Sequence, residues 1–270
     1  MSTRTRITAP RTLGLAALLA LGVAPAYGDE QSQSELAKAS QNPVANMISL
    51  PFQNNVNFDV GPEKGTQNVL NIQPVWPFGV SDDWNIITRT IIPIVSQPPA
   101  SKGGDRKDGL GDTTATAWLS PAKPGALIWG AGPVFLVPTS TSNQLGAGEF
   151  GLGPSVLVLA MPDPWVIGSL FSNVWSVTGD TSVNLFTWQI IANLNLAAGW
   201  YLTSIPIITA DWKNDSGDRW TVPLGGGVGK IMKVGKMPVN GQVQAFYNVV
   251  HPDAGPNWSM RFQLQFLFPK

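Results

Sequence analysis

The sequence has no cysteine and only one histidine, His251, among its 270 residues. Without cysteine the chain cannot form disulfides, use a thiol nucleophile or bind zinc through thiolates. A single histidine also excludes metal sites built from several imidazoles. We therefore expect no metal site in this protein.

Charge is scarce as well. Asp, Glu, Lys and Arg make up 13% of the chain, and 17 basic residues balance 17 acidic ones; an ordinary soluble domain is about a quarter charged. This balance gives no basic footprint for nucleic acid, so we expect no nucleic-acid partner. The 28 glycines, 23 prolines and 11 tryptophans are abundant by contrast, and 43% hydrophobic residues exclude a disordered chain.

Long apolar runs are missing beyond the N-terminus, which argues against transmembrane helices. At the N-terminus, three arginines within the first eleven residues precede an apolar stretch, residues 13–23, and an Ala-Pro-Ala cleavage site ends at Ala26. The apolar stretch is too short to span a bilayer comfortably, so we expect a signal peptide, residues 1–28, rather than a membrane anchor. Its removal takes away three arginines and leaves 14 basic and 17 acidic residues, a net charge of −3.

The next segment, residues 29–45, is polar and contains Pro43. It has room for one or two helical turns before the proline stops them. A short plug or periplasmic helix and a flexible leader are both compatible with this pattern.

From residue 46 onwards, polarity alternates with the period of two that is typical of β-strands. The last segment is the clearest case: large apolar side chains occupy the even positions from Trp258 to Phe268, and the odd positions hold Ser259, Arg261, Gln263 and Gln265. The preceding segment repeats the pattern, which only Phe246 breaks. Alternation alone does not exclude a soluble β-sandwich, because it does not say which solvent each face meets.

Segment length favours a membrane barrel over a sandwich. Soluble strands usually have about five or six residues, whereas a tilted strand needs about 9 to 11 to cross a bilayer. Turn signals divide the chain into about twelve longer segments: residues 46–58, 66–79, 84–97, 109–120, 126–138, 149–160, 165–178, 183–196, 199–212, 218–230, 239–250 and 258–268.

The connections alternate between tight turns and longer, more charged loops. Outer-membrane barrels have short periplasmic turns, longer outer loops and an even strand number. The sequence therefore predicts an all-β protein in which residues 46–270 form an antiparallel transmembrane β-barrel, in contact with lipid, in the outer membrane of a Gram-negative bacterium. One departure is expected at residues 230–238, which predict a periplasmic turn longer than the others.

Tryptophans mark the expected membrane interfaces, where barrels carry girdles of aromatic side chains. One group is predicted near the short turns: Trp76, Trp84, Trp118, Trp165 and Trp200. A second group is predicted near the long loops: Trp175, Trp212, Trp220 and Trp258. An arginine facing lipid near the midplane would cost about 2 to 4 kcal/mol, so Arg89 and Arg261 are expected to face the lumen.

The final strand, Met260 to Phe268, resembles the β-signal that hands barrels to their assembly machinery, although Pro269 and Lys270 follow it. Further resemblance, to the phenol meta-pathway transporter-like family of Gram-negative proteins, rests on Gln41–Asn46, Gln67–Pro74, Trp84–Pro93 and Ser216–Gly227. Members of this family are often labelled as transporters or mislabelled as neuromedin U. The resemblance implies a barrel that passes small, often aromatic, organic compounds. The Asn42-Pro43 pair also resembles the plug region of fatty-acid-channel barrels.

A barrel of about twelve strands predicts a narrow, partly occluded lumen, since eight strands leave no free space and sixteen leave an open pore. We expect a passive channel for small organic solutes, including aromatic or hydrophobic compounds. Structural packing of the lumen explains the same polar residues equally well. The candidate pore-lining residues are Arg89, Gln189, Asn193, Asn240, Gln242, Gln244, Arg261, Gln263 and Gln265.

Two other functions remain open at the level of sequence. A structural or adhesive barrel would act through its outer loops. An outer-membrane phospholipase would need His251 beside Ser259, with Asn248 or Asn257 orienting the imidazole. Two glycine-rich stretches, residues 146–151 and 225–230, do not match nucleotide-binding loops, because the first is followed by a strand-like run and the second has Ile231 in place of the required Ser or Thr. We therefore expect no cofactor. We also expect no catalytic residue.

Overall fold

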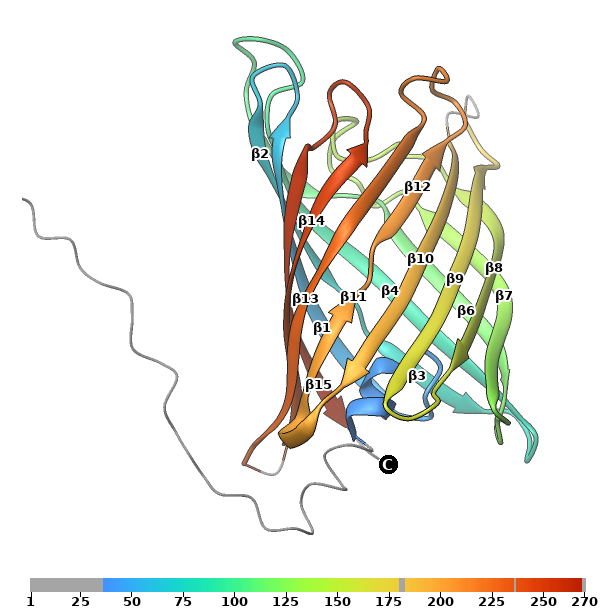
Figure 1. Cartoon of the computed structure of the whole chain (residues 1–270). Helices are drawn as coiled ribbons and strands as arrows, with labels where there is room; N and C mark the ends of the chain where they lie inside the picture. The colour runs from blue at the N-terminus through green and yellow to red at the C-terminus, as the bar shows by residue number, and fades with distance from the viewer. Residues whose placement is uncertain (1–35, 180–182, 236, 269–270) are drawn as a thin grey trace, which may run out of the picture.

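The fold is known from a computed structural model that describes residues 36–179, 183–235 and 237–268. About two thirds of the described residues are β-strand, wound into a closed antiparallel barrel, with a short helix at residues 36–41 (Figure 1). The expected signal peptide, residues 1–28, lies outside the described residues. Within the described residues, no helix is both long and apolar enough to cross a membrane.

Fifteen strand elements build the wall. Three pairs of elements, β2 with β3, β5 with β6 and β11 with β12, each follow one another along a single barrel strand, so 15 − 3 leaves twelve barrel strands. The elements are β1 (Ile48–Val60), β2 (Gly65–Ile72), β3 (Val75–Gly79), β4 (Trp84–Gln97), β5 (Lys107–Leu110), β6 (Thr113–Pro121), β7 (Leu127–Val137), β8 (Gly151–Ala160), β9 (Trp165–Ser176), β10 (Asn184–Asn195), β11 (Trp200–Ser204), β12 (Ile207–Asp211), β13 (Trp220–Val234), β14 (Met237–Val250) and β15 (Trp258–Phe268).

The first and last strands close the ring. β1 pairs with β15 from Ile48 opposite Phe268 to Phe58 opposite Trp258, and every other barrel strand pairs with its sequence neighbours. Closure leaves no strand edge facing lipid, where an unpaired backbone group would be costly. The predicted antiparallel twelve-strand barrel is confirmed.

The prediction of a long turn at residues 230–238 is wrong. β13 continues to Val234 and β14 already begins at Met237, with these two residues paired. Lys230 belongs to β13, and its Nζ lies 4.7 Å from the Trp200 ring centroid. A cation stacked on an interfacial tryptophan is compatible with a strand end.

The two ends of the barrel differ. The chain's C-terminal strand ends at the lower end in Figure 1, where the connections are short: residues 80–83, 122–126, 161–164 and 196–199. At the upper end the connections include residues 98–106, 138–150, 212–219 and 251–257. This asymmetry agrees with the predicted alternation of short turns and longer loops.

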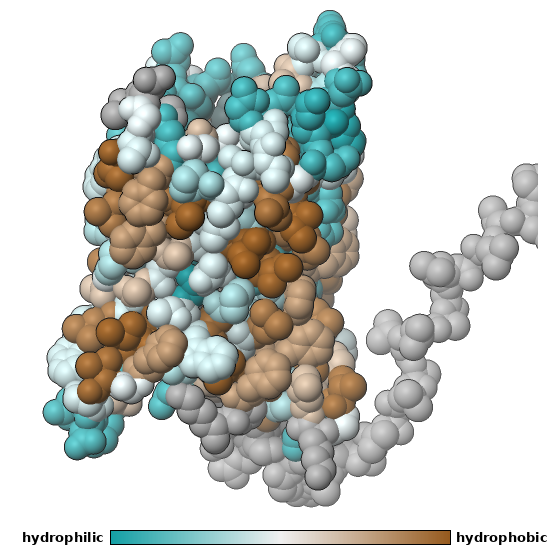
Figure 2. All heavy atoms as spheres, turned by 180° about the vertical axis from the view of Figure 1, so that it is seen from behind, coloured by the Kyte–Doolittle hydropathy of each residue, from teal (hydrophilic) through white to brown (hydrophobic). Residues whose placement is uncertain are grey.

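The outer surface is apolar between two hydrophilic ends, as Figure 2 shows. In β15, Phe262 and Leu264 are each 44% exposed, whereas Arg261 and Gln265, on the opposite face, are buried. The period-two alternation therefore separates a lipid-facing surface from the lumen, as the sequence predicted.

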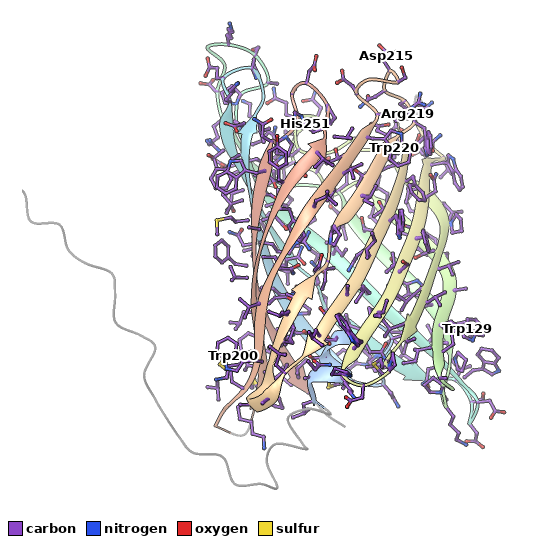
Figure 3. All side chains as sticks on the ribbon, viewed as in Figure 1. Trp129, Trp200, Asp215, Arg219, Trp220 and His251 are labelled. Carbon is purple, nitrogen blue, oxygen red and sulfur yellow. The ribbon has the colours of Figure 1, made fainter. Side chains whose placement is uncertain are left out.

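Tryptophans gather towards both ends of this surface; Figure 3 shows Trp129 and Trp200 low and Trp220 high on the barrel. Trp118 is the exception to the predicted groups: it is fully buried, and its Nε1 donates to Ser155 Oγ at 3.0 Å inside the barrel. It shares its face with buried Thr116 and Ser120, while Leu119 faces out. Trp129, which the prediction omitted, lies instead against Trp84 with ring centroids 5.9 Å apart.

The pairing of the wall skips residues beside two facing prolines. Pro133 of β7 is opposite Pro154 of β8, and neither has a backbone N–H to donate. Two residue pairs are missing on the other side of each of these strands. Ala117 and Trp118 of β6 do not pair with β7, and Asn173 and Val174 of β9 do not pair with β8. An apolar hollow on the outer surface lies over this interruption.

The two faces of the wall should respond differently to charge. Replacing Phe262, near the middle of β15, with arginine should lower the free energy of unfolding by about 2–4 kcal/mol, because a cation is placed in the bilayer core. Val249, exposed one residue from the end of β14, is the matched control, and Val249→Arg should cost only about 0–1 kcal/mol. Urea unfolding in lipid vesicles measures both; equal losses would contradict the assigned membrane position.

Candidate permeation site

The N-terminal segment lies inside the lower end of the barrel (Figure 1). Its helix, residues 36–41, is tied to the wall by polar contacts: Lys38 Nζ lies 2.7 Å from Asp163 Oδ1, and Gln41 Nε2 donates to Asn195 Oδ1 at 2.9 Å. The helix ends just before Pro43, as predicted, and Asn42 Oδ1 then accepts the backbone N–H of Val44 at 3.0 Å.

Apolar contacts hold this segment in place. Val44 belongs to a buried cluster with Ile87, Trp118 and Ile191 from the wall, and Ala37 and Met47 belong to a second cluster with Ile231 and Leu267. The inner face of the barrel is therefore hydrophobic where the segment packs. The lower part of the lumen is filled by protein rather than left as an open pore.

A cavity of about 180 Å³ remains between the segment and the wall. Its lining combines amide side chains, two arginines and aliphatic residues from both sides of the lumen. Eight of the nine residues named from the sequence lie on it: Arg89, Gln189, Asn193, Asn240, Gln242, Arg261, Gln263 and Gln265.

Gln244 is not on the cavity wall but is buried beside it. Its Oε1 accepts the backbone N–H of Ile205 at 3.0 Å, and its Nε2 lies 3.4 Å from Gln242 Oε1. Ile205 is the first residue of the break between β11 and β12, so Gln244 satisfies a backbone donor that the sheet leaves free. This contact is structural.

Asn240 connects the segment to the wall. Its Oδ1 accepts a hydrogen bond from Tyr201 Oη at 2.6 Å, and its Nδ2 lies 3.2 Å from Gln265 Oε1 and 3.5 Å from Ser40 Oγ. Tyr201 can enter the lumen because Gly229 faces it, and a Cβ at that glycine would lie 2.1 Å from the Tyr201 ring. Tyr201 was not predicted from the sequence, because it resembles the other aromatic residues of the strands.

The two arginines are held by aromatic rings. The Arg89 guanidinium lies 5.2 Å from the Trp118 ring centroid, and that of Arg261 lies 5.0 Å from Phe246. Phe246, the residue that breaks the alternation of its strand, is therefore a lumen residue that supports Arg261. Such stacking fixes a guanidinium while leaving its N–H groups available.

Further amides on the cavity wall were not predicted. Gln53, Asn71 and Gln73 project into the cavity from β1 and the strand beside it. They follow the same alternation as the predicted set, and Asn54, which stands between two inward residues, obscures it in the sequence. The cavity wall is thus more amide-rich than predicted.

The loop over residues 138–150 folds into the upper mouth of the barrel. Asp112 accepts the backbone N–H groups of Ser140 at 3.1 Å and Gly148 at 3.0 Å. Gly109 and Gly111 leave room for the loop, because Cβ atoms there would lie within 3.0 Å of Thr141 or Leu145. This loop narrows the passage above the cavity.

His251 lies at the upper rim of the barrel (Figure 3). Its Nδ1 is 2.8 Å from the carbonyl of Pro252, while Asn248 Nδ2 donates to Pro256 and Asn257 Nδ2 donates to Asp59. The two amides proposed to orient the imidazole are thus engaged elsewhere. In the described part of the chain, no group of three metal-ligating side chains comes together either.

No protein-family model and no curated protein matches this sequence. Among solved structures, the chain is similar to the COG4313 outer membrane channel from Pseudomonas putida F1, with 18% identity over 82% of this chain and 94% of that one and a TM-score of 0.61.

The NanC porin matches with 9% identity, 83% and 100% coverage and a TM-score of 0.50. The CymD monoaromatic hydrocarbon channel is more distant, with 9% identity, 92% and 95% coverage and a TM-score of 0.45. At these identities the likeness is one of fold: the chain has the barrel architecture of outer-membrane proteins.

Proposed function

We propose that this protein is a passive outer-membrane channel for small organic compounds. The observation that carries the proposal is the polar cavity enclosed by an apolar, lipid-facing wall. Amides and arginines inside such a wall offer a solute hydrogen bonds that the bilayer does not. The description of the similar Pseudomonas putida barrel as an outer membrane channel supports this proposal.

Passage through this lumen is narrow and selective. The N-terminal segment fills the lower lumen, and the loop over residues 138–150 narrows the upper mouth. A cavity of about 180 Å³ remains between the segment and the wall. An engineered cavity of about 150 Å³ is enough for one benzene molecule, so a single-ring compound is a reasonable upper size. This size fits the aromatic substrates that the resemblance to the phenol meta-pathway family implies.

Outer-membrane lipids and the barrel-assembly machinery complete the proposed set of partners. Lipid would contact the exposed apolar residues, and the machinery would recognise β15, whose alternating side chains match a β-signal. We propose no enzymatic activity, since the hydrogen bonds of Asn248 and Asn257 do not favour a phospholipase. An adhesive role is not favoured either, because the longest loop folds inwards.

Single-channel recording in planar bilayers tests the proposal. The refolded barrel should give small, discrete conductance steps, and deletion of residues 36–45 should raise the step size severalfold because the lower lumen loses its filling. A gel shift on heating verifies that both proteins are folded barrels. A folded deletion variant that stays electrically silent would contradict the proposal.

Arg261 should set the ion preference of the channel. Replacing Arg261 with glutamate should shift the preference from anions towards cations, since it removes one of the two positive charges on the cavity wall and adds a negative charge where none of the described lining residues is acidic. Reversal potentials under a salt gradient measure this change. The matched control is Arg219→Glu at the upper rim, which should leave the preference almost unchanged (Figure 3). An unaltered preference in the Arg261 variant would show that it is not in the ion path.

A further inference from the structure

The cavity carries two positive charges without a carboxylate to balance them. Arg89 and Arg261 both line it, and no acidic side chain is found among its described lining residues. Buried charges in proteins are normally paired, because the desolvation of an isolated ion is costly. The charge arrangement in the lumen is therefore suited to an anion that enters from outside.

The hydrogen bonds of the arginines are also incomplete. Arg261 is 8% exposed and makes two hydrogen bonds, from Nε to Asn55 Oδ1 at 3.0 Å and from an Nη atom to the carbonyl of Ile205 at 2.7 Å. Arg89 Nε has no partner among the described residues. A guanidinium has several N–H donors in one plane, which match the two oxygens of a carboxylate.

The opposite wall has unsatisfied groups as well. Asn193 is 1% exposed, and its Oδ1 and Nδ2 atoms both lack partners within the described chain. Gln41 Oε1, on the N-terminal segment, also has no hydrogen-bond partner among the described residues. These atoms belong to residues that line the same cavity as the arginines, so the unsatisfied donors and acceptors converge on one space.

Part of the lining is aliphatic. Ile91, Ile191, Ile205 and Ile207 contribute apolar surface to the cavity beside its amides. A ligand that meets both the arginines and this apolar surface has a single anionic group and a compact apolar body. A fully hydrated inorganic anion would leave the isoleucines against water, and a neutral hydrocarbon would leave the arginines unpaired.

We propose that the cavity is a binding site for a small organic carboxylate, of the size of one aromatic ring, whose negative charge is attracted by the unbalanced positive charges of Arg89 and Arg261. The stacking of each arginine on Trp118 or Phe246 positions it before the ligand arrives. Little side-chain freedom is then lost on binding. The route by which the ligand reaches the cavity rests on the proposed channel function. Binding of the ligand in the cavity does not depend on that function.

Benzoate and benzamide have the same aromatic ring and differ in charge, so a comparison of their affinities isolates the contribution of the negative charge. Titration calorimetry of the refolded protein in detergent should show saturable binding of benzoate and binding of benzamide at least about tenfold weaker, because the neutral amide forgoes charge-assisted hydrogen bonds. Equal affinity for the two compounds, or no binding of benzoate, would overturn the proposal.

Three variants locate the site. Arg89→Gln and Arg261→Gln should each weaken benzoate binding by about tenfold or more. Arg219→Gln is the matched control, since this arginine is also stacked on a tryptophan, 5.4 Å from the Trp212 ring centroid, but lies outside the cavity. If a glutamine variant fails to fold, the lysine variant at the same position, Arg89→Lys or Arg261→Lys, is measured in its place, since lysine keeps the charge. Loss of affinity only in the Arg219 variant would place the carboxylate at the rim and contradict the proposal.

The same ligands in planar bilayers distinguish this proposal from the channel function. Brief current blocks by benzoate, absent in Arg89→Gln, are the expected result. A silent barrel that still binds benzoate in detergent would refute the channel and leave the site standing. A conducting barrel that neither binds benzoate nor is blocked by it would refute the site alone.

Discussion

Closure of the hydrogen-bonded ring is the constraint on which the rest of this structure depends. In a bilayer the backbone can donate and accept only within the protein, so a sheet that crosses it cannot end in a free edge. Here the seam is the pairing of β1 with β15, which runs without interruption from Ile48 to Phe58. Since β15 is the last strand and β1 follows directly on the N-terminal segment, the same closure places that segment at the lower mouth of the lumen.

Closure also explains why so much polarity gathers inside. Each strand has two faces, and one of them meets the lipid, so most amides and both arginines of the strands turn inwards. The interior is too narrow for these groups to be fully hydrated, and they satisfy one another instead, as Tyr201, Asn240, Gln265 and Ser40 do. The few that do not are the groups that make the cavity chemically distinctive.

Much of this architecture was predictable from sequence because period-two alternation reports directly on the two solvents of a membrane barrel. The twelve strands and the inward side of Arg89 and Arg261 follow from it. The predictions failed where the type of a residue does not match the face or the element on which it lies. Trp118 and Phe246 are aromatic but face the lumen, and Lys230 and Lys233 are charged but belong to a strand.

What stayed beyond the sequence is whatever depends on contacts between distant segments. The helix at residues 36–41 was expected in outline, but its bond from Gln41 to Asn195 joins positions far apart in the chain. The inward fold of residues 138–150 depends on Asp112 and on two glycines that leave space for it. No local pattern carries that information, since each partner looks ordinary by itself.

The facing prolines of β7 and β8 give the wall an uneven mechanical strength. Beside Pro133 and Pro154 the pairing with β6 and with β9 each lacks two residue pairs, whereas β13 and β14 are joined by an almost unbroken ladder. Lateral tension in the bilayer would act equally on every strand pair. The ring would therefore yield first beside these prolines, and amide hydrogens there would exchange with solvent sooner than those of the β13 and β14 hairpin.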